Sequence, residues 1–210
     1  MNIAIIAAAG KAGSRIMAEA VRRGHRVTAI VRHPDKLQQI VPVVQKGVLD
    51  LTVDDLNAFD VVVNALAASA GNETLHVTAG RHLIAALTET NVRLIVIGGA
   101  GSLYSDASKK TLLKDEIGFP AVFYPTAANQ AKNLEDLRAS RQLKWTFVSP
   151  SAIFAIGKRT GHYKTGKDVL LTNASGRSYV SYEDFAIAII DEIENPQHIK
   201  KRFTVVSASE

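Results

Sequence analysis

The chain has no cysteine among its 210 residues. This absence excludes disulfide bonds, thiolate catalysis and zinc sites with sulfur ligands, and it suits a reducing compartment. The sequence also lacks any apolar run near the roughly 18 residues that span a bilayer. Its first residues carry no basic segment of the kind that begins a signal peptide. We therefore expect a soluble, cytoplasmic protein with no membrane partner.

Excess charge is also small. The chain has 25 Lys and Arg against 20 Asp and Glu, a net charge of +5. Basic residues are scattered, with small clusters at Arg22-Arg23, Lys109-Lys110 and Lys200-Lys201-Arg202. A nucleic-acid-binding protein more often concentrates basic residues on one face or interleaves them with aromatic ones. The clusters therefore predict solvated surface, and we expect no nucleic-acid partner.

Internal repeats, low-complexity tracts and linkers are absent too, so we expect one domain over residues 1–210. Apolar strand-like runs alternate with helical segments as far as Pro150. This alternation predicts an α/β fold, a Rossmann-like doubly wound parallel sheet with helices on both faces. The predicted strands are 3–8, 27–31, 41–45, 61–63, 94–97 and 145–148, and the predicted helices are 12–23, 34–40, 51–58, 74–90 and 126–140.

After the core of residues 1–150, the pattern changes in a smaller C-terminal extension, residues 151–210. Runs 169–172 and 177–180 flank a turn-rich break, which predicts a hairpin or a pair of short strands. A helix over 182–194 follows, capped by Ser181, and 203–206 is the last predicted strand. We expect this extension to form a lid or a wall of a substrate site.

The start of the chain carries the most informative motif. An apolar run is followed by Gly10-Lys11-Ala12-Gly13, a helix that Ser14 opens, and a second apolar run. Such a glycine turn lets the backbone approach a pyrophosphate, and the helix that follows presents free N–H groups to it. The first glycine of the usual three is replaced by Ala7, which fits if its φ is negative. The motif predicts dinucleotide binding; the alternative is a turn that only packs helix on strand.

Arg32 ends the second apolar run, and His33 follows it. Proteins that prefer NAD place a carboxylate at this position, where it binds the ribose 2′-hydroxyl and repels a 2′-phosphate. A guanidinium suits a phosphate instead. We therefore predict NADP(H) in preference to NAD(H), with a solvated cation at a strand end as the alternative.

Six segments of the chain carry a family resemblance that spans nearly its whole length. Together they resemble the atypical short-chain dehydrogenases with an NAD(P)H-binding domain, and within them the bacterial NADH-flavin reductases and biliverdin-IXβ (flavin) reductase. The segments are 3–16, 24–32, 60–65, 131–135, 145–150 and 179–184.

The resemblance implies positions for the cofactor. Asp50 would lie beside the adenine amino group, although it equally suits a cap for the next helix. Small residues after the fourth strand would let the middle of the cofactor pass, although Asn64 equally suits a loop amide. The residues expected to bind the cofactor are Ala7, Ala9, Gly10, Lys11, Ala12, Gly13, Ser14, Arg32, Asp50, Leu51, Asn64, Ala65, Leu66, Lys132 and Pro150.

A catalytic phenol is missing where relatives have one. Many carry a Tyr four residues before a Lys; if Lys132 is that Lys, the Tyr position is Ala128. Tyr124 lies eight residues before Lys132, and Pro125 separates it from the predicted helix. Lys132 either orients the nicotinamide ribose or is a surface residue paired with acidic neighbours. No catalytic residue is assigned; the candidates are Lys132, Tyr124 and Ser102.

Hydride transfer to a flat acceptor needs few catalytic groups, because stacked geometry and the cofactor supply most of the chemistry. We therefore predict an NAD(P)H-dependent reductase of a flavin, a quinone or a similar small molecule. Phe154, His162 and Tyr163 are candidates for contacting this acceptor; alternatively, Phe154 belongs to the core and the other two to an exposed loop. No metal site is expected, and the protein would be a monomer or a small homo-oligomer.

Two other functions remain open at this point. A non-enzymatic NADP(H) sensor would bind the cofactor without turnover, and the replacement of the phenol by Ala128 is compatible with it. A nucleotide-sugar epimerase or dehydratase would need a Tyr–Lys pair and a longer substrate region, and the sequence shows neither clearly.

Overall fold

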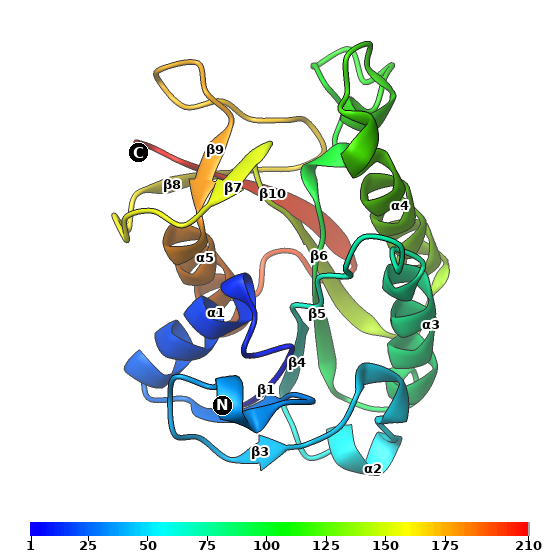
Figure 1. Ribbon diagram of the computed structural model, residues 1–210, viewed down its shortest axis with the longest axis vertical. Coiled ribbons are helices and arrows are strands. Elements are labelled where there is room, and N and C mark those ends of the chain that lie inside the picture. The colour runs from blue at the N-terminus through cyan, green and yellow to red at the C-terminus, as the bar shows by residue number, and fades with distance from the viewer. Residues whose placement is uncertain (210) are drawn as a thin grey trace.

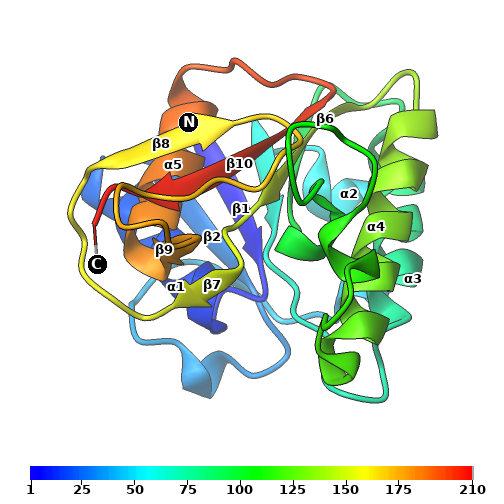
Figure 2. The ribbon, with the colours of Figure 1, turned by 90° about the horizontal axis from the view of Figure 1, so that it is seen from above.

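An eight-stranded sheet forms the centre of the protein (Figures 1 and 2). The structure is a computed structural model, and it describes residues 1–209. The strand order β3-β2-β1-β4-β5-β6-β10-β8 contains the doubly wound order 3-2-1-4-5-6, which confirms the predicted fold class. The strands are β1 (Asn2–Ile6), β2 (Arg26–Ile30), β3 (Val43–Val44), β4 (Val61–Asn64), β5 (Arg93–Ile97), β6 (Lys144–Ser149), β8 (Tyr163–Gly166) and β10 (Lys201–Ser207).

The central strands are apolar because both faces of the sheet are covered. All residues of β4 and β5 are buried. Along β1, side chains alternate between two cores: Ile3 and Ile5 belong to one, and Ala4 and Ile6 belong to the other. All neighbouring strands are parallel except β8, which is antiparallel to β10.

Helices cover the two faces in pairs. In Figures 1 and 2, α1 and α5 lie together on one side of the sheet, and α3 and α4 lie on the other. Helix α1 turns its apolar residues Ile16, Met17 and Ala20 toward its core. No helix in residues 1–209 has the length and apolar character needed to cross a membrane. The helices are α1 (Lys11–Arg22), α2 (Val53–Leu56), α3 (Leu75–Leu87), α4 (Tyr124–Ala139) and α5 (Tyr182–Glu194).

Of the hairpin or pair of short strands predicted over 169–172 and 177–180, the structure contains only one short strand, at 179–181. The turn itself forms, because Gly176 N–H donates to the carbonyl of Asn173 at 3.0 Å. Asn173 N–H also donates to the carbonyl of Arg177 across the turn, at 2.9 Å, but no strand ladder within residues 1–209 continues this pairing. Instead β9 (Tyr179–Ser181) pairs in parallel with β7 (Ile153–Ala155) in a separate two-stranded sheet. Strand β8 was not predicted; with β10 it joins the extension to the main sheet.

Two local boundaries also differ from the predictions. The predicted helix 34–40 is only a 3₁₀ turn at Pro34–Lys36, because Ile40 is fully exposed and no apolar stripe is buried there. Helix α4 begins at Tyr124, two residues before the predicted start. Pro125 does not separate Tyr124 from the helix, because proline fits the first helical turn, where its missing N–H needs no partner.

Candidate functional site

Ala7 makes the turn that ends β1, in a left-handed conformation with φ of 58°. The expectation of a negative φ is therefore wrong. Two hydrogen bonds hold this turn: Ala7 N–H donates to the carbonyl of Ile30 at 3.0 Å, and Gly10 N–H donates to the carbonyl of Ala7 at 2.9 Å. Alanine thus occupies a conformation that usually belongs to glycine.

Gly13 brings α1 close to this turn. A Cβ at Gly13 would lie 3.0 Å from the Cα of Ala8 and would overlap the carbonyl oxygen of Ala7. Because only glycine leaves this space, the helix packs directly on the end of β1. Turn and helix therefore have the close approach that the glycine spacing predicted.

The N-terminus of α1 offers unpaired backbone donors. Ser14 is the first residue with a helical N–H bond, to the carbonyl of Gly10 at 2.9 Å. The N–H groups of Lys11, Ala12 and Gly13 come before it and have no intrahelical acceptor. The first turn of α1 contains no acidic residue, so the positive end of the helix dipole is uncompensated. Such a helix end is suited to a phosphate.

A cleft of about 760 Å³ opens beside this helix end, at the carboxyl ends of β1, β2 and β4. Of the predicted cofactor residues, Ala7, Ala9, Gly10, Arg32, Asp50 and Leu66 line it. The lining residues that were not predicted include Lys36, Lys46, Ser69, Asn72, Thr74 and Thr78. The run of small and polar residues after β4 was the one sequence signal for Ser69 and Asn72, whereas Thr74 and Thr78 fall in the predicted helix over 74–90.

Basic side chains gather at one end of the cleft. Arg32, His33 and Lys36 line it, are exposed, and form no ion pair within residues 1–209. Lys46 differs, because its ammonium binds both carboxylate oxygens of Asp55, at 2.7 and 2.8 Å. This hydrogen bonding lowers the pKa of Asp55 to about 2. The guanidinium of Arg32 and the ammonium of Lys36 form no ion pair within residues 1–209, and such groups are suited to binding an anionic group.

The loop after β4 is held by two buried side chains. Asn64 accepts a hydrogen bond from Leu66 N–H at 3.2 Å, and Nε2 of His76 accepts one from Ala68 N–H at 3.5 Å. His76 is 4% exposed, and burial lowers its pKa although Glu73 opposes this shift. Asn64 therefore acts as the satisfied loop amide that was its alternative role. His76 was missed, and its only sequence signal was a histidine among apolar residues near the start of α3.

The remaining predicted cofactor residues lie outside the lining of the cleft. Lys11, Ala12, Gly13 and Ser14 form the first turn of α1. Leu51, Ala65 and Pro150 are buried. Lys132 is exposed on α4, and its ammonium pairs with Glu135 and Asp136, each at 3.2 Å. The structure therefore does not bring Lys132 into the cleft and gives it the surface pairing that was its alternative.

The other two catalytic candidates are also engaged elsewhere. Ser102 is buried, and its hydroxyl and carbonyl oxygens accept hydrogen bonds from Arg202 at 3.1 and 2.6 Å. Tyr124 is 45% exposed at the start of α4, with the ammonium of Lys114 5.5 Å from its ring centre. Tyr124 and Lys132 share a helix but are separated by about 12 Å along its axis. They do not form a phenol–ammonium pair.

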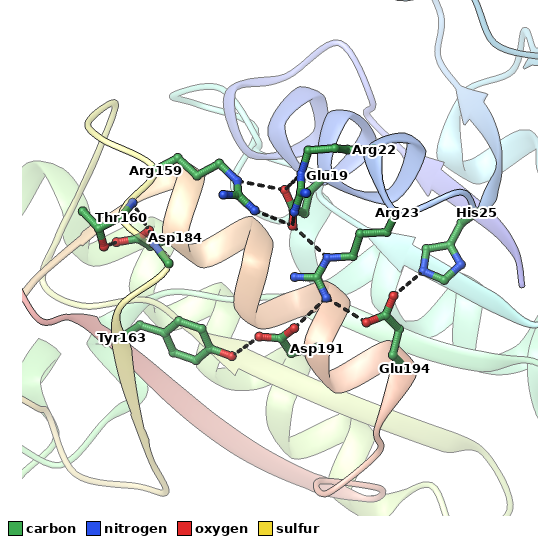
Figure 3. A network of polar contacts seen from close by, with 11 residues as sticks. Glu19, Arg22, Arg23, His25, Arg159, Thr160, Tyr163, Asp184, Asp191 and Glu194 are labelled. Carbon is green, nitrogen blue, oxygen red and sulfur yellow. Dashed lines mark hydrogen bonds and ion pairs between the residues drawn. The ribbon is translucent and has the colours of Figure 1, made fainter.

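The substrate candidates also take structural positions. Phe154 on β7 packs against the rings of Tyr182 and Phe185, with centroids 4.0 and 4.7 Å away. The Tyr163 hydroxyl donates to the carboxylate of Asp191 on α5, as Figure 3 shows. Burial and this bond raise the pKa of Tyr163. His162 is exposed on the loop before β8. Phe154 therefore packs in the core and His162 lies on an exposed loop, as their alternatives stated. The exposed loop expected as the alternative for Tyr163 is wrong, because Tyr163 is half-buried on β8.

The segment before β8 is held by buried acids. Asp184 is fully buried and accepts hydrogen bonds from the N–H groups of Thr160 and Gly161 at 2.7 and 2.9 Å. Arg159 binds Glu19 of α1 at 3.0 Å, together with Arg22 and Arg23 (Figure 3). Burial opposes ionisation of Glu19, but these three arginines outweigh it and hold its pKa far below the usual range. Segment 157–161 is thus fixed along α1 and α5.

A dinucleotide fits this arrangement. The open N–H groups of α1 suit its pyrophosphate, the cleft suits one nucleoside, and the three basic side chains suit an added phosphate. Among residues 1–209, no group of three or more histidines and carboxylates lies close enough together to hold a metal ion. Fold and site therefore define a protein of the doubly wound dinucleotide-binding class.

The chain belongs to the NAD(P)H-binding family, whose model matches residues 7–208. It is 53% identical to the uncharacterised protein YwnB of Bacillus subtilis (strain 168), over the whole of both chains. The structure of SP1627 from Streptococcus pneumoniae TIGR4, a putative NADH-flavin reductase, matches with 43% identity, 99% coverage of each chain and a TM-score of 0.94. The family match and these relatives confirm the family resemblance: the chain is an NAD(P)H-binding, reductase-like protein.

A more distant solved structure shares the fold alone. ChuY, an anaerobillin reductase from Escherichia coli O157:H7, is 18% identical, with 100% of this chain and 98% of that chain covered and a TM-score of 0.79.

Proposed function

We propose that this protein is an NADPH-dependent reductase of flat acceptors such as flavins or quinones. The preference for NADPH rests on the basic end of the cleft. Arg32, His33 and Lys36 form no ion pair there within residues 1–209, and Arg32 stands at the position where NAD-preferring proteins have a carboxylate.

One observation carries the choice of reaction: Tyr124 and Lys132 form no phenol–ammonium pair. Each catalytic candidate has another partner, which is Arg202 for Ser102, Lys114 for Tyr124 and Asp136 for Lys132. An alcohol dehydrogenase or an epimerase must move a proton on and off a hydroxyl, which needs a positioned acid or base. Reduction of a flavin or a quinone needs stacked geometry, and water can supply the remaining proton. Bound NADPH supplies the hydride.

The test is the loss of NADPH absorbance in the presence of FMN, riboflavin or a simple quinone, repeated with NADH. Oxidation that depends on the acceptor and is faster with NADPH supports the proposal. Equal rates with the two cofactors refute the NADPH preference. Absence of any acceptor-dependent oxidation refutes the reductase.

A second candidate is an NADP(H) sensor that binds the cofactor without turnover. The same observation favours the sensor, because Ser102, Tyr124 and Lys132 each have another partner. Tight NADPH binding in a direct titration, with no oxidation by any of the three acceptors, would select the sensor. An epimerase is not favoured, because the Tyr–Lys pair it requires is missing at Ala128 and Lys132.

A further inference from the structure

The face of α4 that meets the sheet carries a glutamine that the sequence did not single out. Ala127, Leu134 and Leu137 are buried, and they lie three residues before, four after and seven after Gln130. This spacing places Gln130 in the middle of the inward face of the helix. Lys132 is about 200° further around the helix axis, on the outer face.

Gly99 provides the space that Gln130 occupies. The backbone of Gly99 is extended, with φ of −129° and ψ of 167°, so its conformation does not require glycine. A Cβ on Gly99 would overlap Oε1 of Gln130 and would lie 3.3 Å from its Cδ. A side chain at this position would therefore displace the carboxamide that packs against Gly99.

This contact lies at the end of the sheet where a dinucleotide binds. Gly99 comes two residues after the last residue of β5, at the carboxyl edge. In a doubly wound sheet the two halves of a dinucleotide lie on opposite sides of the point where strand order reverses, here between β1 and β4. The cleft with Arg32 takes the adenosine half, so the ends of β4 and β5 face the nicotinamide half.

The Gln130 carboxamide is available for a ligand. It is half-buried and makes no hydrogen bond to any side chain or backbone group of residues 1–209. A carboxamide donates through Nε2 and accepts through Oε1, which matches the paired hydroxyls of a ribose. The carboxamide carries no charge, so it can bind a ribose without stabilising the ionised form of a tyrosine, as the lysine of a Tyr–Lys pair would.

We propose that Gln130 positions the nicotinamide half of the cofactor by hydrogen bonding to its ribose hydroxyls. The inference rests on the cofactor placement given under the proposed function. It does not require turnover.

The experiment measures dissociation constants for NADPH and for 2′,5′-ADP, which contains the adenosine half alone. Gln130→Met keeps the length of the side chain and removes its hydrogen bonds. We expect it to weaken NADPH binding about 3- to 10-fold, the range of a neutral hydrogen bond, and to leave 2′,5′-ADP unchanged. Gly99→Ala, which displaces the carboxamide, should give the same pattern.

Lys132→Ala is the matched control, because it changes the same helix two residues away on the outer face. It should alter neither constant. The proposal is overturned if Gln130→Met binds NADPH like the wild type, if it weakens both ligands equally, or if Lys132→Ala has the same effect. A wild-type protein that binds NADPH without oxidising it would refute the reductase and leave this binding test valid. A wild-type protein that does not bind NADPH would overturn both.

Discussion

At the scale of single residues, Ala7 has an unfavourable backbone conformation in the turn between β1 and α1. A left-handed alanine costs about 1–2 kcal/mol relative to its preferred conformations, whereas glycine adopts φ of 58° freely. Ala7→Gly should therefore raise the free energy of unfolding by up to about 1 kcal/mol, after allowing for the greater freedom of glycine in the unfolded chain. Urea denaturation measures this change.

The neighbouring Ala8 is the control for that substitution. It is fully buried and its φ is not positive. Ala8→Gly should lower the free energy of unfolding, because it removes a buried methyl group and adds only entropy to the unfolded chain. A loss of stability in Ala7→Gly as well would show that the left-handed turn carries no strain.

Arg32 carries the second residue-scale prediction, which concerns cofactor preference. A hydrogen bond to a charged group contributes about 1.5–3 kcal/mol, and exposure to solvent places Arg32 at the low end of that range. Arg32→Ala should weaken binding of NADPH and of 2′,5′-ADP about tenfold and leave NADH unchanged. Titration of all three ligands measures it.

Arg26 is the matched control for Arg32. It is exposed at the opposite end of the same strand, so Arg26→Ala removes the same charge far from the cleft. An equal loss of NADPH affinity in both variants would mean that Arg32 acts only through the net charge of the protein. An unchanged ratio of NADPH to NADH affinity in Arg32→Ala would refute the assigned role.

In the turn between β1 and α1, the close approach at the glycines was predictable, whereas the conformation of Ala7 and the catalytic candidates were not. The spacing of Gly10 and Gly13 specifies a backbone geometry, so the sequence predicted it correctly. Lys132 was proposed by analogy with relatives, and its role depends on which face of α4 meets the sheet. The buried positions Ala127, Leu134 and Leu137 define that face, and they exclude Lys132 from it.

At the scale of elements, long helices and central strands followed from hydrophobic periodicity, but strand pairing in the extension did not. The segment ending in Tyr179–Ser181 has the same strand propensity whether it pairs with its neighbour or with β7. The turn at Asn173–Gly176 suggested the neighbour. The actual partner of β9 depends on how α5 and segment 157–161 pack. These contacts join residues that are far apart in the sequence.

Asp184 connects these elements and supports a prediction about them. Its carboxylate accepts bonds from Thr160, Gly161 and Ser207, so two other parts of the extension, segment 157–161 and β10, depend on it. In Asp184→Asn one accepting oxygen becomes an NH₂ group that faces buried donors. We expect a loss of about 2–3 kcal/mol in the free energy of unfolding, together with faster amide hydrogen exchange across 157–161.

The exposed Asp54 on α2 provides the comparison for Asp184. Asp54→Asn makes the same chemical change without removing a buried acceptor, so stability should change by less than about 0.5 kcal/mol. Equal effects in the two variants would show that the contacts of Asp184 do not stabilise the extension. Uniformly faster exchange over the whole chain would show that they are not specific to 157–161.

At the scale of the whole molecule, buried ionisable groups make the free energy of unfolding depend on pH in two separate pH ranges. Burial lowers the pKa of His76 below its unfolded value of 6.5, against a smaller effect of Glu73. Below pH 6.5 the unfolded chain therefore binds a proton that the folded protein does not, and stability falls with pH toward the folded pKa of His76. A single group gives at most about 1.4 kcal/mol per pH unit.

The second window belongs to carboxylates. Burial opposes ionisation of Glu19 and Glu192, but hydrogen bonds from arginines to the first, and from His198, Gln197 and Arg93 to the second, lower both pKa values below 4.5. Their contribution to stability is complete above about pH 4.5 and is lost as pH falls through the folded values. The predicted profile is a shallow decline below pH 6.5 and a steeper one below pH 4.5.

Urea unfolding at a series of pH values from 7.5 to 3.5 separates the two windows. His76→Gln should remove the shallow decline and keep the steeper one, because it removes only the histidine that is buried beneath the cleft loop. His33→Gln, at an exposed histidine, should keep both. If His76→Gln leaves the profile between pH 6.5 and 4.5 unchanged, another group titrates in that window. His76, which in its neutral form accepts a hydrogen bond from Ala68 N–H, would then not be the group that makes the stability of the loop after β4 depend on pH.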